Sequence, residues 1–496
     1  MRIFSISKVA VVAFAICALT TVDLSAQCAS IGPMPPDLGA GDGYGNVALD
    51  GDVLVVGSFA DSDLAPNRGA AYVFRRDLTG QFQFEQKLIA SDGQADDYFG
   101  WYVAVDGNLI VVANTPGLYF DGSAYVFRYD GVTWNEEQRI VPDIDQPNDH
   151  FANSLAVSGN TIAVGCPWHT GTISTAGAIY TFVHNGSEWV QEAELFANDA
   201  IAADLLGYSM VLEGDTLGAG AVSADVDGVS DAGAFYVFER VAGVWTQVVK
   251  FVEPAPTAEQ AFGYAAAMDG DTIVVGATPN TGEGTDLGNA RVYRRVAGVW
   301  SFEQNLTPAD QEPGDWFAAG LAISGDTILA SSQLDDELFA DMGSVYVYKR
   351  TGAVWTFSEK ITICGGVAEE YLGSSMAIDG DVGFASAYGS SAAGAYSGAI
   401  YTIVVAPSFV RGDVTVDGNI NIADAISALG YLFSSANISC VLAADTNDDE
   451  AVNVADAIYL LSYLFSSGPA LPAPNPSCGV DPTSGTLDCA SFSICP

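Results

Sequence analysis

The chain has 496 residues, with 61 Asp or Glu against 17 Lys or Arg, so that its formal net charge is −44 at pH 7. Because binding to phosphate groups requires basic patches, this charge excludes nucleic acids and anionic membrane surfaces as partners, and leaves calcium and neutral sugars. The length fits one large repeat array followed by a small module.

Residues 1–26 are predicted to form an export signal that is removed from the mature protein. Two basic residues precede an apolar stretch at residues 9–19, and Leu24-Ser25-Ala26 supplies a cleavage site. No later window reaches the roughly 18 uninterrupted apolar residues of a transmembrane helix. We therefore expect a secreted, extracellular protein. Lipidation of Cys28 is the alternative, although Gln27 separates this cysteine from the small residues.

A segment pattern returns seven times between residues 41 and 405, with a period of about 55 residues. Each copy opens with an aromatic residue or leucine, continues to a tight turn with glycine at its centre, and has a second glycine before an aromatic-containing strand. The opening residues are Tyr44, Phe99, Phe151, Leu206, Phe262, Phe317 and Leu372. The turn glycines are Gly51, Gly107, Gly159, Gly214, Gly270, Gly325 and Gly380, and the strand glycines are Gly69, Gly122, Gly177, Gly233, Gly288, Gly343 and Gly398.

Each copy is predicted to form four antiparallel β-strands. Glycine permits the positive φ of a hairpin turn, short β-rich runs flank each turn, and no part of the repeat has helical periodicity. A last strand contains a tryptophan in five copies, at Trp134, Trp189, Trp245, Trp300 and Trp355. Four strands repeated seven times predict a mainly β chain with a seven-bladed β-propeller over residues 41–405. The seventh copy ends after its third strand, so either residues near Ile31 or a three-stranded blade closes the ring.

With downstream segments such as Val275-Gly276-Ala277, the opening pattern resembles the FG-GAP repeat of integrin α-subunit propellers and their bacterial relatives. Propellers of this family often hold calcium in a loop of alternating Asp residues, and Asp225, Asp227 and Asp231 form a similar segment. The resemblance therefore implies a calcium site at this loop. The periodic tryptophans are interpreted as core between blades, with sugar-stacking platforms as the alternative.

A residue with a side-chain oxygen stands two positions before each opening residue. A propeller places these positions as a ring on one face, and we interpret them as turn residues that accept hydrogen bonds from backbone N–H groups. A rim that binds calcium or sugar hydroxyls is the alternative. The positions are Asp42, Asp97, Asp149, Asp204, Gln260, Asp315 and Glu370.

After a linker at residues 406–410, a loop followed by an apolar helical pattern occurs twice, with the copies 32 residues apart. The oxygen-bearing residues of each loop follow the EF-hand arrangement around calcium. This duplication resembles a type I dockerin, a small all-α, EF-hand-like module, over residues 411–468. The resemblance implies Ca²⁺ ligands at Asp413, Thr415, Asp417, Asn419, Asn421 and Asp424 in the first loop, and at Asp445, Asn447, Asp449, Ala451, Asn453 and Asp456 in the second.

Two residues depart from this pattern. Thr415 replaces the usual Asn or Asp, and Glu450 stands where glycine normally allows a sharp turn, so the second loop is predicted to be the weaker one. Because ordered acidic loops repel without a cation, the module is expected to fold on binding calcium. Arg411-Gly412-Asp413 resembles an adhesion motif, but Asp413 is already assigned to calcium.

By the same resemblance, the module docks to a cohesin-type domain. The contact residues are expected directly after each loop, where this chain is apolar and the best-known type I modules carry hydroxyl groups. These residues are Ile422, Ala423, Val454 and Ala455.

Seven cysteines follow residue 26. In an exported protein, four of them near the Cys-rich tail at residues 469–496 predict two disulfides, with three pairings open. The remaining three leave at least one thiol outside a disulfide, which we expect to be buried. The first group is Cys440, Cys478, Cys489 and Cys495, and the second is Cys28, Cys166 and Cys364.

No nucleophile–histidine–acid motif, metal-binding His pair or Gly-x-Ser-x-Gly segment occurs, so no catalytic residues are predicted. We favour a non-catalytic protein that binds a polysaccharide or cell-surface ligand through its propeller and a cohesin-type partner through its C-terminal module. The alternative is a glycoside hydrolase of a dockerin–cohesin complex. Such an enzyme would use a pair of carboxylates, and the acidic residues of this chain are too plentiful for one pair to be singled out.

Overall fold

The computed structural model describes residues 27–77, 80–115, 122–144, 149–278, 287–405, 409–434, 436–449, 451–466, 468–476, 487 and 489. The predicted export signal, residues 406–408 of the predicted linker, Glu450, Cys478 and Cys495 lie outside the described residues. Among the helices that are described, none combines the length and the apolar character needed to cross a membrane.

Antiparallel four-stranded sheets repeat along the chain and make it mainly β, as the sequence predicts. The first sheet contains β2 (Tyr44–Asp50), β3 (Val53–Ser58), β4 (Ala70–Arg76) and β5 (Phe82–Leu88), and the second contains β6 (Val103–Asp106), β7 (Leu109–Asn114), β8 (Ser123–Tyr129) and β9 (Trp134–Ile140). The third contains β10 (Ser154–Ser158), β11 (Thr161–Cys166), β12 (Ala178–His184) and β13 (Trp189–Leu195). The fourth contains β14 (Leu206–Glu213), β15 (Thr216–Ala221), β16 (Ala234–Val241) and β17 (Val244–Phe251), and the fifth contains β18 (Phe262–Asp269), β19 (Thr272–Ala277), β20 (Asn289–Val296) and β21 (Val299–Leu306).

An eight-stranded sheet contains two further units, which the N-terminal strand joins. Its order is β22-β23-β24-β25-β1-β28-β27-β26. The strands are β22 (Phe317–Ser324), β23 (Thr327–Ser332), β24 (Ser344–Thr351), β25 (Val354–Ile363), β26 (Leu372–Asp379), β27 (Val382–Ala387), β28 (Ala399–Val404) and β1 (Gln27–Ile31). β1 pairs antiparallel with β28, where Ile31 lies opposite Tyr401. Of the two closures that the sequence leaves open, the structure therefore has the one that uses residues near Ile31.

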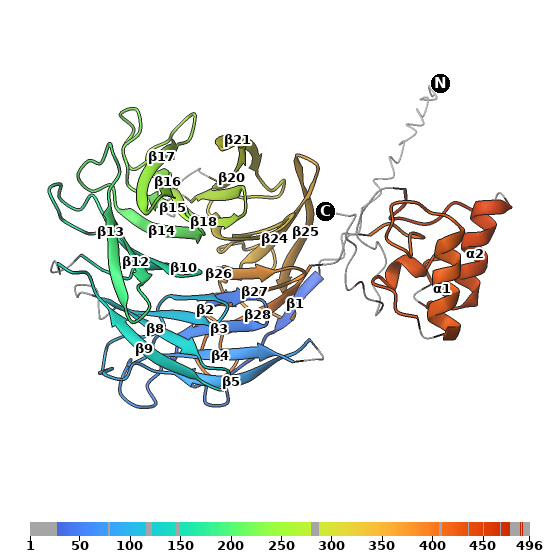
Figure 1. Cartoon of the computed structure of the whole chain (residues 1–496), viewed down its shortest axis with the longest axis horizontal. Coiled ribbons are helices and arrows are strands. Elements are labelled where there is room, and N and C mark those ends of the chain that lie inside the picture. Colours follow the sequence, from blue (N-terminus) through green and yellow to red (C-terminus); the bar gives the residue numbers. More distant parts are fainter. Residues whose placement is uncertain are drawn as a thin grey trace, which may run out of the picture.

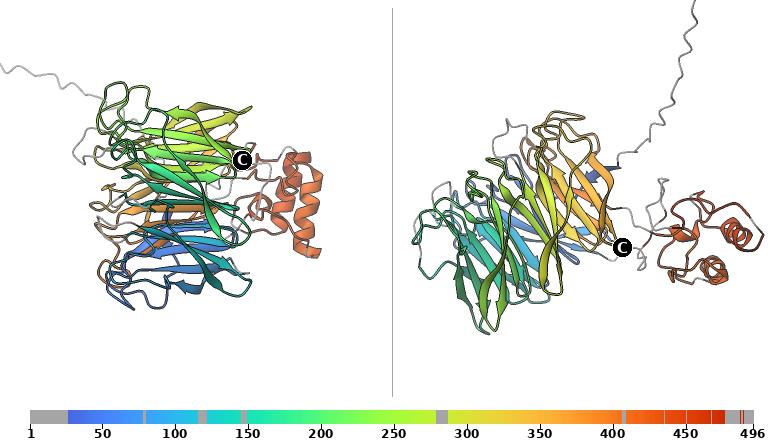
Figure 2. Two further views of the ribbon diagram at one scale, coloured as in Figure 1. Left: turned by 60° about the vertical axis from the view of Figure 1, so that its left-hand side comes forward. Right: turned by 90° about the horizontal axis from the view of Figure 1, so that it is seen from above.

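The first strands of successive units contact one another around a common centre. β2 contacts β6, β6 contacts β10, and the series continues through β14, β18, β22 and β26, which contacts β2 again. Last strands such as β5, β9, β13 and β17 lie at the periphery in Figure 1, and Figure 2 shows the same sheets from two other directions. This arrangement of repeated four-stranded sheets is consistent with a β-propeller.

The strand glycines and the opening residues of the repeat meet where one unit contacts the next. Gly69 forms a parallel bridge with Phe99 of the following unit, and Gly398 forms one with Tyr44 of the first unit. A Cβ atom at either glycine would lie 2.0 Å from the carbonyl oxygen of its partner. Glycine recurs at this position because the neighbouring backbone fills the space of a side chain.

Hydrogen bonds between the hairpin turns also join successive units. The side chain of the residue before each turn glycine accepts a hydrogen bond from the N–H of the next turn glycine. The pairs are Asp50 with Gly107, Asp106 with Gly159, Ser158 with Gly214, Glu213 with Gly270, Asp269 with Gly325, Ser324 with Gly380, and Asp379 with Gly51. The last pair links the end of the array to its beginning, so these turn residues form a closed series.

The repeated tryptophans are buried between units. Their exposed fractions lie between 2% and 9%. Trp355 is one example: its backbone N–H donates to Oε1 of Gln304 in the preceding unit at 2.9 Å, and its indole Nε1 donates to Glu303 at 3.0 Å. Arg350 lies over the ring, with Cζ 5.0 Å from the centroid. The tryptophans are therefore core residues, as interpreted from the sequence, and not exposed platforms.

Two disulfides are present in the described part of the chain. Cys28 of β1 is bonded to Cys364, directly after β25, and Cys440 is bonded to Cys489. The first bond pairs two cysteines that the sequence leaves outside the predicted disulfides, whereas the second is one of the pairings left open for the C-terminal group. Cys166 is a buried thiol whose Sγ donates to the carbonyl oxygen of Asp149 at 3.1 Å.

The C-terminal segment contains α1 (Ile422–Ser434), a 3₁₀ turn at η1 (Leu442–Ala444) and α2 (Val454–Phe465). The two helices contact each other, and both lie outside the group of sheets in Figures 1 and 2. Ala425 of α1 packs with Leu460 of α2 in a small buried cluster. The predicted helical patterns therefore form helices, and each follows one of the two acidic loops.

Candidate functional sites

The first acidic loop folds around two buried carboxylates. Asp413 accepts hydrogen bonds from the N–H groups of Asp417 at 3.1 Å and Gly418 at 2.9 Å. Asp424, in the first turn of α1, accepts from the N–H of Thr415 at 2.9 Å and from its hydroxyl at 2.8 Å. Asp413 and Asp424 are 1% and 0% exposed, so the loop backbone encloses both of them.

The second acidic loop brings three carboxylates together. One oxygen from each of Asp445, Asp449 and Asp456 lies within 4.8 Å of the others. Asp456 accepts hydrogen bonds from the backbone N–H of Asn453 at 2.8 Å, and the Asn453 side chain caps the start of α2. The carboxylates converge in this loop, although the sequence predicts it to be the weaker one.

The donor set of the second loop fits a hard cation. Asp445 and Asp456 are both fully buried. Burial raises the pKa of the Asp456 carboxyl, and the nearby Asp445 and Asp449 raise it further. In the described part of the chain, Oδ1 of Asn447 is buried without a hydrogen-bond partner. Converging carboxylates and an amide oxygen without a donor are ligands that calcium prefers, whereas they destabilise each other in its absence.

The remaining predicted ligands lie on the same two loops. In the first loop, the Asn421 side chain donates to the carbonyl of Asn419 at 3.0 Å, and burial raises the pKa of the Asp413 carboxyl. In the second, Ala451 offers its carbonyl oxygen, which accepts from Nδ2 of Asn453 at 2.9 Å. The predicted ligand positions thus lie in the two loops, except for Asp424 and Asp456, which lie in the first turns of α1 and α2.

Arg411 is a part of this region that sequence reasoning missed. Its guanidinium is fully buried, and it forms ion pairs with Asp448 at 2.8 Å and with Asp445 at 3.8 Å. Nε donates to the carbonyl of Ala473 at 2.9 Å. Because Arg411 and Asp413 are both buried, the Arg-Gly-Asp tripeptide is not displayed as an adhesion motif. The sequence shows only that Arg411 stands close to Asp413. Its ion pairs with Asp445 and Asp448 of the second loop depend on the fold.

Replacing Arg411 by methionine is expected to destabilise the C-terminal helices by about 3 kcal/mol, because it leaves the Asp445 and Asp448 carboxylates without their buried counter-charge. Thermal unfolding followed by far-UV circular dichroism would measure the loss. Arg411→Lys, which keeps the charge but not the forked geometry, should fall between the wild type and Arg411→Met. Equal stability of all three proteins would contradict this role.

The third predicted calcium loop lies between β15 and β16. Val226 and Val229 form a β-bridge there, and the N–H of Asp231 donates to Oδ1 of Asp225 at 3.1 Å. Asp225 and Asp227 are exposed. Among the described residues, the groups of three His, Cys, Asp or Glu side chains with ligand atoms within 4.8 Å of one another do not include these aspartates.

Apolar side chains on the two helices form two matching exposed stripes. In each helix, large apolar residues stand at the first position, four residues later and eleven residues later. The exposed fractions are 52% for Ile422, 62% for Ile426 and 72% for Phe433 on α1, and 43% for Val454, 61% for Ile458 and 67% for Phe465 on α2. We call these six residues the helix stripes. Of the four predicted contact residues, Ile422 and Val454 begin the stripes, Ala455 is exposed and Ala423 is half-buried.

The residues two positions before each opening residue are turn residues, as interpreted from the sequence. Asp204 accepts a hydrogen bond from the N–H of Ile201 at 2.7 Å, and Asp315 accepts one from Glu312 at 2.7 Å. Gln260 accepts from Thr257 at 3.2 Å in the same way, so a neutral amide can serve this turn. Six of the seven side chains are buried and Asp97 is half-buried, so these residues do not form an exposed rim.

Burial of these carboxyls predicts a pH dependence of stability. It raises the pKa of Asp204 to about 6 and that of Asp315 to about 6. Because each folded-state pKa lies above the unfolded value of about 3.9, their contribution is fully present below about pH 4 and is lost as pH rises through about 6. We expect the midpoint of thermal unfolding to rise when pH falls from 7 to 5. In the Asp204→Asn, Asp315→Asn double variant this rise should be smaller, and an unchanged rise would contradict the assignment.

Aromatic residues gather next to the first strands, in segments for which the sequence has no continuous motif. Rings of Phe59 and Trp101 lie 4.5 Å apart between centroids, and those of Tyr371 and Tyr388 are stacked at 4.8 Å. Trp101 is 36% exposed and Tyr388 is 45% exposed. Phe59 and Trp101 come from successive units of the array, so the fold brings this pair together, whereas Tyr371 and Tyr388 flank the first two strands of one unit.

Comparison with known proteins identifies the repeat. The family model described as FG-GAP repeat matches residues 34–74, 82–127, 134–182, 189–238, 245–293 and 300–348. No curated protein matches the chain significantly. Among solved structures, one similar chain is a protein from Lactobacillus plantarum, with 16% sequence identity and a TM-score of 0.41, over 66% of this chain and 86% of that one. Because the six matched segments cover more than half of its residues, the chain belongs to the FG-GAP repeat family.

Proposed function

We propose that this protein is a secreted, calcium-binding protein that presents a ligand surface on a seven-bladed propeller and docks to a cohesin-type partner through residues 411–468. The closed series of first strands and the β1 strand, which completes the unit of β26–β28, support seven blades. The helix stripes carry the docking half of the proposal, since they are large, apolar and exposed in duplicate.

Calcium would organise the module that presents the helix stripes. The loops that contain Asp413 and Asp445 lead directly into α1 and α2, and Asp424 and Asp456 are both loop carboxylates and residues of the first helical turns. A cation in each loop would link the first turn of the helix to the loop that precedes it. The chain's residues would hold the ion, and the ion would add positive charge next to the buried carboxylates, of which Asp445 is also paired with Arg411.

The helix stripes fit a protein partner with an apolar surface. Exposed apolar patches with polar surroundings mark interaction sites. Ile422 and Val454 occupy equivalent positions in the two copies, as do Ile426 and Ile458. Either helix can therefore offer closely similar side chains to a partner, and the two orientations would be alternatives rather than additive contacts.

On the propeller, the two partly exposed aromatic pairs that contain Trp101 and Tyr388 support a neutral sugar as ligand. Aromatic faces pack against the apolar faces of sugar rings, and the negative charge of the chain does not oppose such a ligand. This surface would bind a polysaccharide while the C-terminal module holds the protein on its partner.

Cohesin-type domains of several types, immobilised one by one, would test the docking. With calcium present, Ile422→Asp and Val454→Asp are each expected to bind the matching cohesin within a few fold of the wild type, because the other helix remains intact. The double variant should lose at least about 100-fold in affinity, through loss of two apolar anchors. Val299→Asp, at a residue of β21 that is 67% exposed, is the matched control. Binding of no cohesin type, or equal binding by the double variant, would contradict the proposal.

A further inference from the structure

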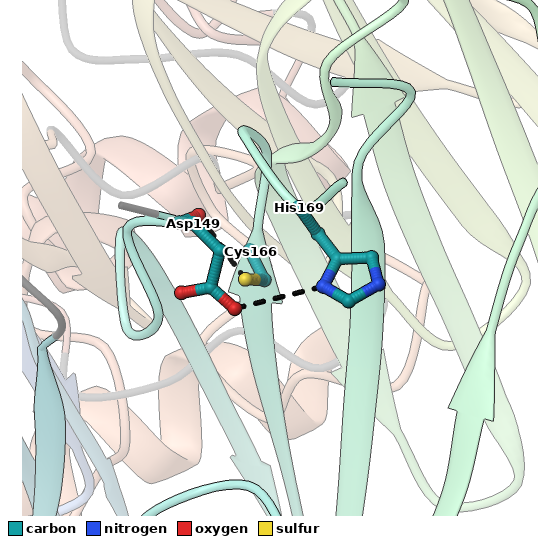
Figure 3. Close-up of side chains that lie close together, drawn as sticks. All are labelled: Asp149, Cys166 and His169. Atoms are coloured by element: carbon teal, nitrogen blue, oxygen red, sulfur yellow. Dashed lines mark hydrogen bonds and ion pairs between the residues drawn. The ribbon is translucent and has the colours of Figure 1, made fainter. Parts of the chain in front are cut away.

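A mixed group of ligating side chains is buried in the third sheet, away from the calcium loops. Cys166 is the last residue of β11, and His169 lies in the turn that follows, where its N–H donates to the Cys166 carbonyl at 3.1 Å. Asp149 precedes the opening Phe151 of the same unit. The exposed fractions of Asp149, Cys166 and His169 are 1%, 0% and 3%. Figure 3 shows the three side chains directed toward one another.

The geometry of this group suits a single metal ion. One carboxylate oxygen, the Cys166 sulfur and one ring nitrogen lie within 4.8 Å of one another. Oδ2 of Asp149 is 3.5 Å from Nδ1 of His169, about the separation of two ligands in a tetrahedral site. In the described part of the chain, this buried Oδ2 has no hydrogen-bond partner. A buried carboxylate oxygen without a donor is costly, and a cation would remove the cost.

The other side of the imidazole is already oriented. Nε2 of His169 lies 3.3 Å from Oε1 of Glu194, and the Tyr180 hydroxyl lies 2.8 Å from the same oxygen and 3.3 Å from Nδ1 of His169. A carboxylate that accepts from Nε2 makes Nδ1 more basic, and a metal bound at Nδ1 would replace the contact of this atom with the Tyr180 hydroxyl. Glu194 would therefore be a positioning residue, and Nδ1 would be the ligand atom.

The positions equivalent to Cys166, His169 and Glu194 in two other units carry a related network of polar and charged side chains. In the first sheet, Ser58 and Asp61 replace the cysteine and the histidine, and Lys87 forms an ion pair with Asp61 at 2.8 Å. Lys87 lies opposite Tyr72 in the sheet, as Glu194 lies opposite Tyr180. The sixth unit repeats this network with Ser332, Asp335 and Lys360, where the ion pair is 2.7 Å long.

In the third sheet, the charges of this network are reversed, with histidine in place of aspartate and Glu194 in place of lysine. A His–Glu ion pair alone would maintain the network. A protonated imidazole would pair with Oδ2 of Asp149 as well as with Glu194, but it does not account for the thiol at the serine position. A thiol, an imidazole and a carboxylate together are ligands that a borderline-soft metal ion prefers.

We propose that Asp149, Cys166 and His169 bind one divalent transition-metal ion of the zinc type. Binding deprotonates the Cys166 thiol, so one proton is released and the hydrogen bond from Sγ to the Asp149 carbonyl is lost. A water molecule completes the coordination. Because all three side chains are buried, the ion has a structural role: it holds the segment before the third unit against the end of β11. Thiolate and imidazole ligands separate this site from the oxygen ligands of the calcium loops.

Cobalt(II) provides a direct test, because only a thiolate ligand adds a sulfur-to-cobalt charge-transfer band in the near ultraviolet. The metal-stripped full chain is saturated with calcium to occupy the acidic loops, and cobalt is then titrated. We expect one equivalent to produce the band, and zinc to abolish it by displacement. Cys166→Ser should remove the band, and the serines of the first and sixth units indicate that this variant folds. His169→Ala should weaken cobalt binding at least about 10-fold, as expected for the loss of one ligand.

Two controls exclude other sources of the signal. His184→Ala removes a histidine of the same sheet that pairs with Glu137 at 3.1 Å, and the band should be unchanged. The Cys478→Ser, Cys495→Ser variant should also keep it. A folded wild-type protein that produces no band, or a band that persists in Cys166→Ser, would overturn the proposal.

Discussion

Replacing Cys28 and Cys364 together by alanine is expected to lower the free energy of unfolding of the sheet array by about 4 kcal/mol. The bond joins residues 336 positions apart, and a cross-link over so long a segment strongly restricts the unfolded chain. It also fixes β1, which is the only strand that pairs with both β25 and β28 among the described residues. Urea denaturation followed by tryptophan fluorescence would measure the change, because the buried tryptophans lie between units.

The Cys440→Ala, Cys489→Ala variant is the control for this prediction. Its disulfide lies in the C-terminal segment, so it should leave the tryptophan transition at the wild-type urea concentration. A wild-type midpoint in the Cys28→Ala, Cys364→Ala variant would show that β1 is held by its hydrogen bonds alone.

Asp456→Ala is expected to weaken calcium binding at the second acidic loop by roughly 100-fold or more, because it removes one of three converging carboxylates. The variant also removes the acceptor of the Asn453 N–H at the start of α2. Calorimetric titration of calcium into the metal-stripped full chain should show one site fewer than the wild type. Far-UV circular dichroism should show a smaller gain of helix when calcium is added.

Asp424→Ala should have the same effect at the first loop, and the double variant should lose both sites. Asp225→Ala tests the loop between β15 and β16 separately, since it removes a further site only if that loop binds calcium. An unchanged number of sites in the Asp424→Ala, Asp456→Ala variant would contradict calcium binding by these loops.

Calcium and protons should partly replace each other in this module. Burial and the neighbouring aspartates raise the pKa of Asp413 and Asp456 in the metal-free chain. Since protonation also relieves carboxylate repulsion, the stabilisation by calcium is expected to decrease as pH is lowered from 7 toward 4.

The sequence by itself determined the repeat and its local elements. Glycines such as Gly51 mark hairpins because they permit positive φ, and the alternation of short β-rich runs with turns predicts four strands in each copy. The 32-residue duplication likewise predicts two loops and two helices, because the ligand spacing of an acidic loop and the helical period are local properties of the chain. These parts of the prediction depend on residues close together in sequence.

Only the tertiary structure decided which distant residues meet. Cys28 and Ile31 belong to β1, the first strand in the sequence, yet this strand completes the last unit. No local pattern indicates that β1 pairs with β28. The hydrogen bond from the Gly51 N–H to the Asp379 side chain depends on the same closure. The Asp149, Cys166 and His169 group also has no sequence signature, since its ligands follow no metal-binding spacing. The physical reason is that strand pairing and side-chain convergence depend on non-local contacts, which form only when the complete ring of sheets brings those segments together.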